Sequence, residues 1–329
     1  MKNIQFNKIG IFRTDRLGDM ILTLPMIKIL KDINPNSEIY LFANKYTEPL
    51  LLNQPDISQY IFIDDVKEDL TTLLKKLNLN MIFFPRPRFK EVFAAFKARI
   101  PIRVGSGFRW YSIFLNHKVF EHRKNGLKNE SEYNLSLISS VTKENYNVEL
   151  FKPFIPMEAK SKVEFTLQEN NINNQIIIVH PGGGDSAPKW PTSYFGEFAK
   201  QIGISNEFSV VITGTIDELQ LCNEVQALAK NSINFCSKFN LSEMIALLDK
   251  AKFVVTNSTG IIHIAAALDK KILGFYPDSP NIGSIRWGPM NQKKIILTPK
   301  NSSSHIESDD LSLISVKDAI DAFYKLQKF

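Results

Sequence analysis

Several features that define whole classes of proteins are scarce or missing in this sequence. Only two of its 329 residues are cysteine, and Cys222 and Cys236 have no metal-ligand pattern beside them, so we expect neither a disulfide nor a zinc site. No apolar run approaches the ~20 residues that span a bilayer. The N-terminus lacks the long apolar centre and small-residue cleavage site of a secretory signal. These absences predict a cytoplasmic protein.

Two nucleotide-binding signatures are also missing. No G-x-G-x-x-G follows the first apolar run, which argues against a nicotinamide or flavin cofactor, and no G-x-x-x-x-G-K-[ST] is present, which argues against a P-loop ATPase. The residues are 44% hydrophobic and 22% charged, as in a globular protein, and the length favours two domains.

Positive charge is concentrated in one segment. The formal net charge is +6, yet residues 86–128 alone contain eleven Lys or Arg and only two acids, Glu91 and Glu121. Aromatic residues are interleaved with these charges. Such a segment could face nucleic acid, an anionic membrane surface or an acidic substrate, or it could be a solvated face whose aromatics belong to the core.

Short apolar runs alternate with helical periodicity along most of the chain. This alternation predicts parallel sheets with helices on both faces. A segment without a clear period, residues 145–160, contains two prolines and predicts a linker. The strands that we expect before it are 9–12, 39–42, 60–63 and 81–84, with helices at 20–30, 66–77 and 130–140. After it we expect strands at 175–179, 208–213, 253–255 and 272–276, with helices at 194–202, 217–229 and 241–248.

The pattern therefore predicts an α/β protein of two Rossmann-like domains. We place the first at residues 1–155 and the second at 156–312, with a C-terminal helix at 313–329 that packs back toward the first domain. Ligands of such sheets bind beyond the carboxyl ends of the strands. The loops after Phe12, Val179, Ile212 and Val255 should then border one cleft.

Two of these loops suit an anion. Ser258, Thr259 and Gly260 stand where a strand gives way to a helix, and unpaired N–H groups and the helix dipole favour a phosphate there. The alternative is that Ser258 or Thr259 only caps the helix. The glycines after His180 and Pro181 would let backbone N–H groups approach an anion closely.

Three separated motifs together resemble the lipopolysaccharide heptosyltransferase family, glycosyltransferases of the GT-B fold that transfer heptose from ADP-heptose to the inner core. The motifs are Arg-x-x-x-Leu-Gly-Asp with a following Leu-Pro (Arg13 to Pro25), His-Pro-Gly…Lys-Trp-Pro (His180 to Pro191) and Asn-Ser-Thr-Gly-x-x-His-x-Ala-Ala-Ala (Asn257 to Ala267). The resemblance covers most of the chain and implies two domains that face each other across a central cleft.

The resemblance implies a role for several residues. Asp19 is the candidate base that accepts the acceptor hydroxyl's proton in an inverting transfer, and its alternative role is a carboxylate that stabilises a helix start. Lys189 would neutralise the leaving diphosphate, or else is a surface lysine. Glu218 would bind the nucleoside ribose, or else is a helix-starting glutamate.

The remaining donor-site candidates are Gly182, Gly183, Ser258, Thr259, Gly260 and His263. Many family members carry aspartate where this chain has Ser258, which can hydrogen-bond a phosphate but cannot act as a carboxylate. His263 is either close to the phosphate or a hydrogen-bonded core histidine. The candidates for binding an anionic lipid-linked oligosaccharide acceptor are Arg13, Arg86, Arg88, Arg103 and Arg109.

The sequence thus predicts a glycosyltransferase that uses an ADP-sugar donor, needs no metal or cofactor, and works at the inner face of the cytoplasmic membrane. The lack of a D-x-D pair agrees with metal independence, since Asp64-Asp65 looks like a strand-end turn. No nucleic-acid partner is expected. Two alternatives are a sugar-nucleotide epimerase of the same architecture and a non-enzymatic nucleic-acid-binding protein that uses residues 86–128.

Overall fold

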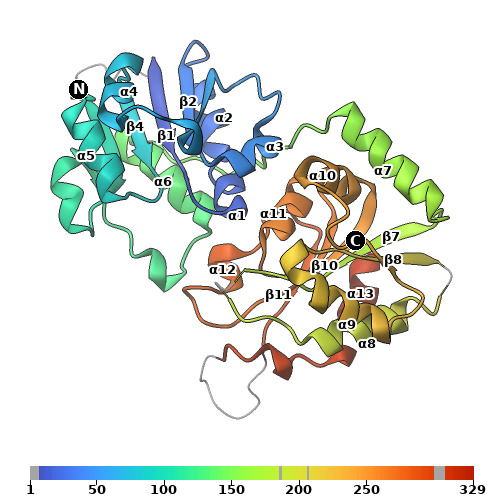
Figure 1. Ribbon diagram of the computed structural model, residues 1–329. Coiled ribbons are helices and arrows are strands. Elements are labelled where there is room, and N and C mark those ends of the chain that lie inside the picture. Colours follow the sequence, from blue (N-terminus) through green and yellow to red (C-terminus); the bar gives the residue numbers. More distant parts are fainter. Residues whose placement is uncertain (1–6, 185–186, 206, 300–307) are drawn as a thin grey trace. The chain divides into compact units, whose positions relative to one another are not determined.

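The chain divides into two compact units in the computed structural model, which describes residues 7–184, 187–205, 207–299 and 308–329 (Figure 1). The N-terminal unit comprises Met1–Arg123 and Lys128–Phe151, and the C-terminal unit comprises Lys124–Leu127 and Lys152–Phe329. The main boundary therefore falls inside the segment that we predicted as the linker.

A six-stranded parallel sheet forms the centre of the N-terminal unit, with the strand order β3-β2-β1-β4-β5-β6. Its strands are β1 (Lys8–Phe12), β2 (Glu38–Ala43), β3 (Gln59–Phe62), β4 (Met81–Phe84), β5 (Ile102–Ser106) and β6 (His117–Val119). In the central strand, Ile11 pairs with Leu41 on one side and Phe83 on the other, and all three are fully buried. Burial on both faces explains why these strands are continuous apolar runs.

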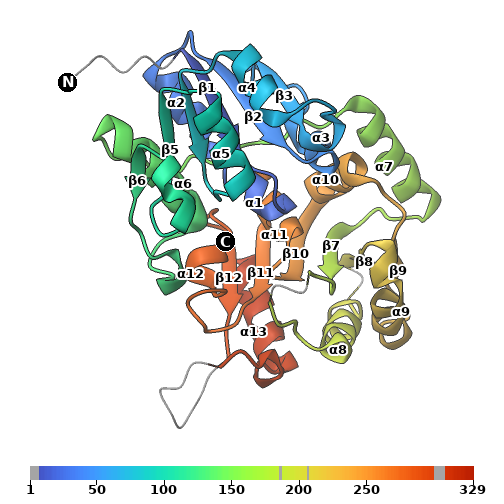
Figure 2. The same cartoon turned by 60° about the vertical axis from the view of Figure 1, so that its left-hand side comes forward.

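Helices cover both faces of this sheet. They are α1 (Leu17–Ile21), α2 (Pro25–Ile33), α3 (Glu48–Leu51), α4 (Leu70–Leu77), α5 (Phe89–Lys97) and α6 (Glu130–Thr142), with single turns η1 (Lys45–Thr47), η2 (Ile63–Asp65), η3 (Trp110–Phe114) and η4 (Arg123–Asn125). α4 packs beside α5 and α2 beside α6, on opposite faces of the sheet (Figure 2).

Two helices of this unit differ from the prediction. The helix expected at 20–30 is two helices, because Pro25 has no N–H to continue α1 and instead starts α2. α5 was not predicted, since its residues belong to the aromatic and basic segment. The predicted helix at 66–77 begins later, where the Asp69 carboxylate accepts a hydrogen bond from the Thr72 N–H at 3.2 Å.

The C-terminal unit repeats the architecture, with the strand order β12-β11-β10-β7-β8-β9 and parallel pairing throughout its described strands. Its strands are β7 (Gln175–His180), β8 (Phe208–Ile212), β9 (Ile233–Asn234), β10 (Ala251–Asn257), β11 (Lys271–Phe275) and β12 (Lys294–Leu297). Its helices are α7 (Met157–Glu169), α8 (Thr192–Ile202), α9 (Leu219–Leu228), α10 (Leu241–Lys250), α11 (Gly260–Ala267), α12 (Ser284–Trp287) and α13 (Val316–Gln327), with η5 (Ile216–Glu218) and η6 (Leu311–Leu313).

The last helix requires a correction. We expected it to pack toward the N-terminal domain, but the buried face of α13 belongs to the core of the C-terminal unit. Ala319 and Phe323 are fully buried there, and the Phe323 ring centroid lies 4.9 Å from that of Phe253 in β10. α13 therefore covers the same face of the sheet as α8 and α9.

Both sheets share one strand order, counted from the first strand of each unit, and this is the order of dinucleotide-binding α/β folds. The prediction of two Rossmann-like domains is confirmed. Each sheet has a switch point where the chain reverses its direction of strand addition. It lies between β1 and β4 in the N-terminal unit and between β7 and β10 in the C-terminal unit. Ligands of such folds bind at these points, beyond the carboxyl ends of the strands.

Candidate active-site residues

Asp19 lies in the first turn of α1, directly after the loop that leaves β1 at the switch point. Its side chain is 15% exposed, and one carboxylate oxygen accepts a hydrogen bond from Nη2 of Arg13. Its carbonyl oxygen accepts a 2.8 Å hydrogen bond from the Thr23 hydroxyl. The carboxylate is thus held by a specific cation rather than only by a helix start.

Arg13 is 1% exposed and is surrounded by carboxylates. Besides Asp19, its Nε lies 3.2 Å from Asp15 Oδ2 and its Nη1 lies 3.8 Å from Glu130 Oε1. Arg123 shares the network, with its Nη1 2.6 Å from Glu130 Oε1. We expected Arg13 to bind the acceptor. Its buried guanidinium faces three acids and not solvent, which argues against direct contact with the acceptor. Of its nitrogens, Nη2 donates to Asp19, while Nε and Nη1 have no hydrogen-bond partner among the described residues.

Two of the remaining candidate arginines join this network from β4's side of the switch point. Arg86 Nη1 lies 3.0 Å and Arg88 Nη2 lies 2.8 Å from Asp15 Oδ1. Their side chains remain 63% and 49% exposed. Arg86 and Arg88 therefore combine a fixed position near the Asp19 network with room to bind a second anion.

The other two arginines are not brought to this group by any described contact. Arg103 Nε donates a 2.7 Å hydrogen bond to the Phe114 carbonyl and Nη1 donates to the Ile100 carbonyl, so its guanidinium holds the end of η3. Its acceptor role stays a prediction, and the contacts described give it a structural role. Arg109 is exposed at the start of η3.

Glu91 was not predicted as a functional residue, yet it is 7% exposed and contacts the Asp19 loop. Its Oε1 accepts a 3.2 Å hydrogen bond from the Thr14 hydroxyl. Burial raises its pKa to about 7, and nearby Asp15 also raises it, while Arg88 opposes both. Glu91 is therefore a carboxyl that changes charge near neutral pH. Its place in a helical, mostly basic segment gave no signal of this.

In the C-terminal unit, the glycine turn after β7 is bound to the residue predicted for the ribose. Oε1 of Glu218 accepts a 2.7 Å hydrogen bond from the Gly183 N–H, and Oε2 accepts one of 2.8 Å from the Thr215 N–H. A Cβ at Gly182 would lie only 2.0 Å from Glu218 Oε1, so a side chain there would displace the Glu218 carboxylate.

The charge of Glu218 is maintained despite its partial burial. Burial disfavours the carboxylate, but nearby His180 and the N–H donors of Thr215 and Gly183 outweigh it and lower the pKa of Glu218. His180 itself is 6% exposed, shares a 3.0 Å hydrogen bond with the Thr213 hydroxyl, and has its pKa lowered by burial. The turns after β7 and β8 are thereby joined.

Asn257, at the end of β10, connects this strand to the turn after β7 and to the loop that carries Trp190. From the sequence, we named it only as part of a motif. Its Oδ1 accepts a 2.8 Å hydrogen bond from the Trp190 N–H, and its Nδ2 donates to the Pro181 carbonyl at 2.8 Å. The amide is 1% exposed. This places the exposed Lys189 beside the glycine turn, where a Cβ on Gly183 would lie 3.8 Å from Lys189 Cε.

The start of α11 completes this group. Thr259 is the N-cap residue, but within the described chain its hydroxyl makes no capping hydrogen bond, which disfavours a simple cap. A Cβ on Gly183 would lie 3.1 Å from Thr259 Cγ2. Gly260 begins the helix, and Ser258 precedes the cap, half-buried. The turn after β7 and the start of α11 therefore lie side by side at the switch point.

His263 lies one turn into α11 and is 5% exposed. Burial lowers its pKa to about 4, so the imidazole is neutral at pH 7. Its Nδ1 has no hydrogen-bond partner among the described residues, so it does not match a fully hydrogen-bonded core histidine.

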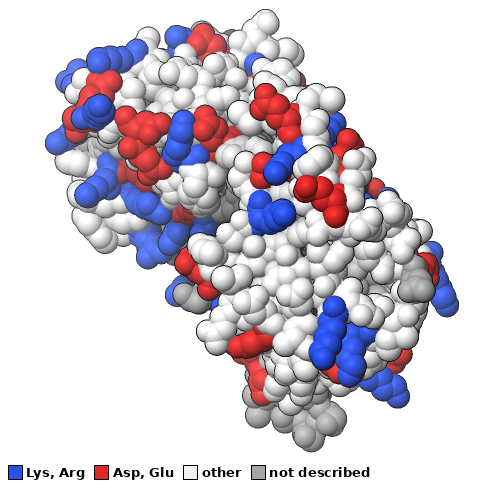
Figure 3. Space-filling model, turned by 45° about the vertical axis from the view of Figure 1, so that its right-hand side comes forward, with Lys and Arg blue, Asp and Glu red and all other residues white. Residues whose placement is uncertain are grey.

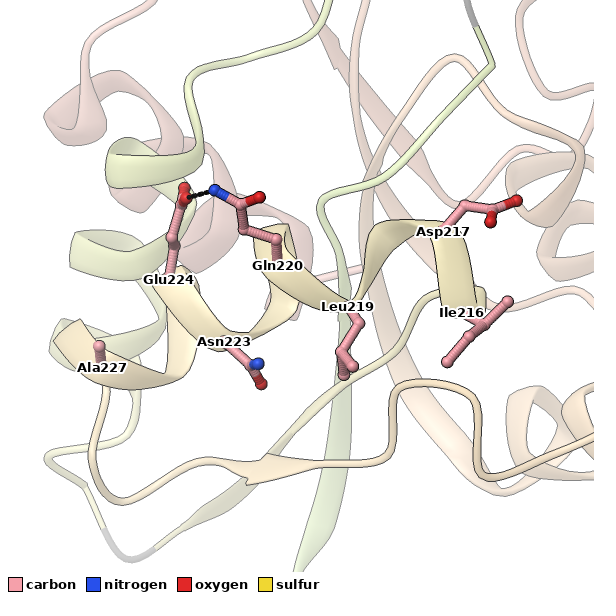
Figure 4. A pocket seen from close by; sticks show the side chains of 7 residues that line it. All are labelled: Ile216, Asp217, Leu219, Gln220, Asn223, Glu224 and Ala227. Carbon is pink, nitrogen blue, oxygen red and sulfur yellow. Dashed lines mark hydrogen bonds between the residues drawn. The ribbon is translucent and has the colours of Figure 1, made fainter.

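Two further features of the chain concern its surface and its capacity to hold a metal. A shallow surface hollow follows η5 and α9, where the Gln220 amide donates to Glu224 at 3.1 Å (Figure 4). It contains none of the predicted site residues. Across the described ranges, no group of three or more His, Cys, Asp or Glu side chains is arranged to hold a metal ion. Both cysteines are free thiols.

Comparison with known proteins gives a consistent result. Residues 91–312 match the model of glycosyltransferase family 9 (heptosyltransferase). The chain is 29% identical to a putative glycosyltransferase of Haemophilus influenzae over 95% of this chain and 94% of that protein. It is 25% identical to lipooligosaccharide heptosyltransferase 2 of the same organism, over 80% and 82% of the two chains.

Among solved structures, the fold is similar to that of the ADP-heptose lipopolysaccharide heptosyltransferase II of E. coli. The TM-score is 0.78 over 97% of this chain and 98% of that one, at 20% identity. This match confirms the predicted α/β fold class, the GT-B architecture of two Rossmann-like sheets.

Proposed function

Because the chain belongs to glycosyltransferase family 9, the heptosyltransferases, we propose that it transfers a heptose or related sugar from an ADP-sugar to the inner core of lipopolysaccharide or lipooligosaccharide. The family assigns the enzyme class, a glycosyltransferase. The donor, the acceptor and the residue roles are the proposal.

One observation carries the donor part of the proposal. The glycine turn, Lys189 and the start of α11 gather at the switch point of the C-terminal sheet, held together by Glu218 and Asn257. Backbone N–H groups at the start of α11, with a lysine beside them, suit the diphosphate of a nucleotide sugar. The Gly183 N–H is held by Glu218 instead, so the glycine turn contributes its close approach to α11. The family relative solved from E. coli is named for its ADP-heptose donor.

The chemistry follows from charge. As the acceptor hydroxyl attacks the anomeric carbon from the face opposite the leaving group, Asp19 accepts its proton. The bond from the anomeric carbon to the diphosphate oxygen breaks, and the departing ADP gains negative charge. Lys189 and the α11 dipole then stabilise that charge where it develops.

On the acceptor side, Arg86 and Arg88 bind the negative groups of the inner core. They stand close to the Asp19 network through Asp15 and keep exposed guanidinium surface. Such an acceptor is anchored in a lipid bilayer, so the enzyme works at the cytoplasmic face of that membrane. Within the described residues, no helix is long and apolar enough to cross a bilayer.

A thermal-shift screen of ADP-, UDP- and GDP-sugars, followed by a transfer assay with and without EDTA, tests this function. A donor at a hundred times its dissociation constant adds ~2.7 kcal/mol of stability. We expect an ADP-sugar to give the largest shift and EDTA to leave turnover unchanged. Strict dependence on manganese or magnesium would contradict the metal-free reaction.

A matched pair of variants tests the donor site. Lys189→Ala should weaken ADP-sugar binding about tenfold or more, because a charged hydrogen bond contributes ~1.5–3 kcal/mol. Lys230→Ala, at another exposed lysine of the same unit, should bind the donor as wild type does. Equal affinity of the two variants for the donor would show that Lys189 is an ordinary surface lysine.

Two other results would support the alternative functions. Formation of epimerised free sugar nucleotide would support the epimerase, and salt-sensitive nucleic-acid binding without transfer would support the nucleic-acid-binding protein.

A further inference from the structure

A continuous group of aromatic rings lies on the N-terminal unit, over α5 and η3. We call it the aromatic surface; its rings are Phe89, Phe93, Phe96, Trp110, Tyr111 and Phe114, and we include the exposed Ile113 of the same turn, η3. Ring centroids lie 5.0 Å apart for Phe89 and Trp110, and 5.0 Å for both Phe93 and Phe96 against Phe114. The rings therefore form one packed cluster of side chains rather than scattered residues.

The outer members of this group face solvent. Trp110 is 71% exposed, Ile113 is 68% exposed and Phe96 is 45% exposed. The alternative that these aromatics are core is therefore wrong for Trp110 and Phe96. Exposed apolar residues that are contiguous mark an interaction site more often than a random surface does. Because the rings support one another, little side-chain entropy remains to be lost on binding.

The charge around the aromatic surface has one sign. Arg86, Arg88, Lys90, Lys97, Arg99 and Arg109 are exposed on or beside α5 and η3. The only acid between residues 86 and 120 is Glu91, which is buried. Lys97 Nζ lies 4.6 Å from the Phe93 ring centroid, so its stem follows the aromatic rings. Figure 3 shows one face of the molecule, on which Lys and Arg lie along one edge of this unit and Asp and Glu lie among the other Lys and Arg of the same face.

The aromatic surface is continuous with the proposed acceptor arginines. The Tyr111 hydroxyl donates a 2.7 Å hydrogen bond to the carbonyl of Pro87, which stands between Arg86 and Arg88. Phe89 follows Arg88 directly and starts α5. Arg86 and Arg88, which are proposed to bind the anionic acceptor, therefore lie at the same edge of the unit as the aromatic surface. The rings of that surface suit the apolar lipid to which the acceptor is attached.

We propose that the aromatic surface docks on an anionic phospholipid bilayer. Trp110, Ile113 and Phe96 enter the boundary between headgroups and acyl chains, which amphipathic indole rings favour. Lys90, Lys97 and Arg99 lie against lipid phosphates. The inference rests on the proposed function for its choice of partner, and it deepens that function by naming the surface that brings Arg86 and Arg88 to a lipid-anchored acceptor.

Vesicle sedimentation tests the docking directly. The full chain is mixed with vesicles of pure phosphatidylcholine, or of equimolar phosphatidylcholine and phosphatidylglycerol, and the pelleted fraction is measured. We expect binding to the anionic vesicles and a loss of binding at high salt. Tryptophan emission should shift to the blue on binding in wild type, and the shift should be absent in Trp110→Phe, which keeps a ring but removes the reporter.

Matched variants separate this surface from general adhesion. Trp110→Ser with Ile113→Ser should weaken partitioning on the order of tenfold or more. Lys90→Gln and Lys97→Gln should each weaken it about fivefold. The controls are Ile204→Ser, at a 72% exposed isoleucine of the C-terminal unit, and Lys230→Gln. We expect both controls to partition as wild type does.

Three results would overturn the proposal. The first is a failure of wild type to bind anionic vesicles, and the second is binding of Trp110→Ser/Ile113→Ser to them that equals that of wild type. The third is a concentration-dependent dimer, seen by ultracentrifugation, that the double variant abolishes. The last would assign the surface to a second copy of the chain. Transfer to a deacylated, water-soluble acceptor should be equal for wild type and the double variant. Vesicle binding without any transfer would refute the proposed function and leave the docking surface intact.

Discussion

The two switch points hold their predicted residues in contrasting ways. In the N-terminal unit, Asp19 is held by charge, within a network in which Arg13 contacts three carboxylates. In the C-terminal unit, the loops are joined mainly by an amide, a hydroxyl and backbone N–H groups around Asn257 and Glu218. The same fold thus carries an ionic site and a mostly neutral one.

The difference suits the two proposed tasks. A base needs a carboxylate in a fixed orientation, and a buried guanidinium provides that but leaves several charges dependent on one another. A diphosphate site needs its positive groups directed to the ligand. The ionised Glu218 and the neutral Asn257 fix the loops, and Lys189 and the α11 dipole are the positive groups proposed to face the donor. The first site should therefore be more sensitive to the loss of a charge, and the second to lost hydrogen bonds.

The largest expected effect is on Asp19. Asp19→Asn keeps the shape but removes the basic lone pair, so turnover should fall ~10²–10⁴-fold while donor affinity stays unchanged. Turnover at saturating substrates, donor affinity and melting temperature are measured together. The control is Asp318→Asn, at another helix-start carboxylate. Its free energy of unfolding should fall by only a few tenths of a kcal/mol. If Asp19→Asn turns over within about threefold of wild type, another group is the base.

Removal of the central cation should break the ionic site as a whole. Arg13→Met leaves Asp15, Asp19 and Glu130 without their shared partner, and one-sided removal from a buried ion pair costs ~3–5 kcal/mol of unfolding free energy. Denaturant unfolding measures this loss. Arg13→Lys keeps the charge without the fork and should lose less, and the exposed Arg99→Met should lose little. A stability of Arg13→Met equal to that of Arg99→Met would show that the network is not coupled.

In the C-terminal unit, Asn257→Ala should cost stability and donor affinity together. It leaves the buried Trp190 N–H and Pro181 carbonyl unsatisfied, at ~1–3 kcal/mol each, and it releases Lys189 from the glycine turn. The matched control is Asn291→Ala, at a buried asparagine of the same unit whose Nδ2 donates to the Lys270 carbonyl at 2.8 Å. The control should lose stability but keep donor affinity, measured by calorimetry. Equal loss of donor affinity in both variants would remove the special role of Asn257.

The smallest expected effect is a pH dependence confined to the ionic site. The pKa of Glu91 is raised from 4.5 in the unfolded chain to about 7 in the folded protein. Its stabilising contribution is therefore complete below pH ~4.5 and is lost as pH rises through ~7. Relative to Glu91→Gln, which mimics the protonated form, wild type should lose ~1–3 kcal/mol between pH 5 and pH 8. Melting curves of wild type, Glu91→Gln and the exposed Glu207→Gln would reveal it, and a pH-independent difference between wild type and Glu91→Gln would refute it.

Eight of the described strands could be predicted because buried parallel strands are uninterrupted apolar runs, and the order of the runs predicted two Rossmann-like domains. The strands β5, β6, β9 and β12 were not predicted, because they are only partly buried. The helices were less certain, since Pro25 divides one and the exposed rings of α5 obscure another. Gly183, Lys189 and Thr259 were named from separate motifs, and they lie near one another in the C-terminal unit. The sequence could not show that Arg13 is buried, because its partner Glu130 is distant along the chain. Nor could it show that Asn257 binds the Trp190 N–H, because that contact depends on the register of two loops.

The packing of α13 has a consequence for how the protein is made. The N-terminal unit is complete in sequence once residue 151 has left the ribosome. The core of the C-terminal unit instead needs Phe323 and Leu326, and the Trp190 indole N–H needs the carbonyl of Ile314, 2.8 Å away. At ~5–20 residues per second, the nascent chain would hold the apolar strands of the second sheet without their covering helix for on the order of ten seconds or more. During that interval the first unit can already be folded, while the second still lacks part of its core.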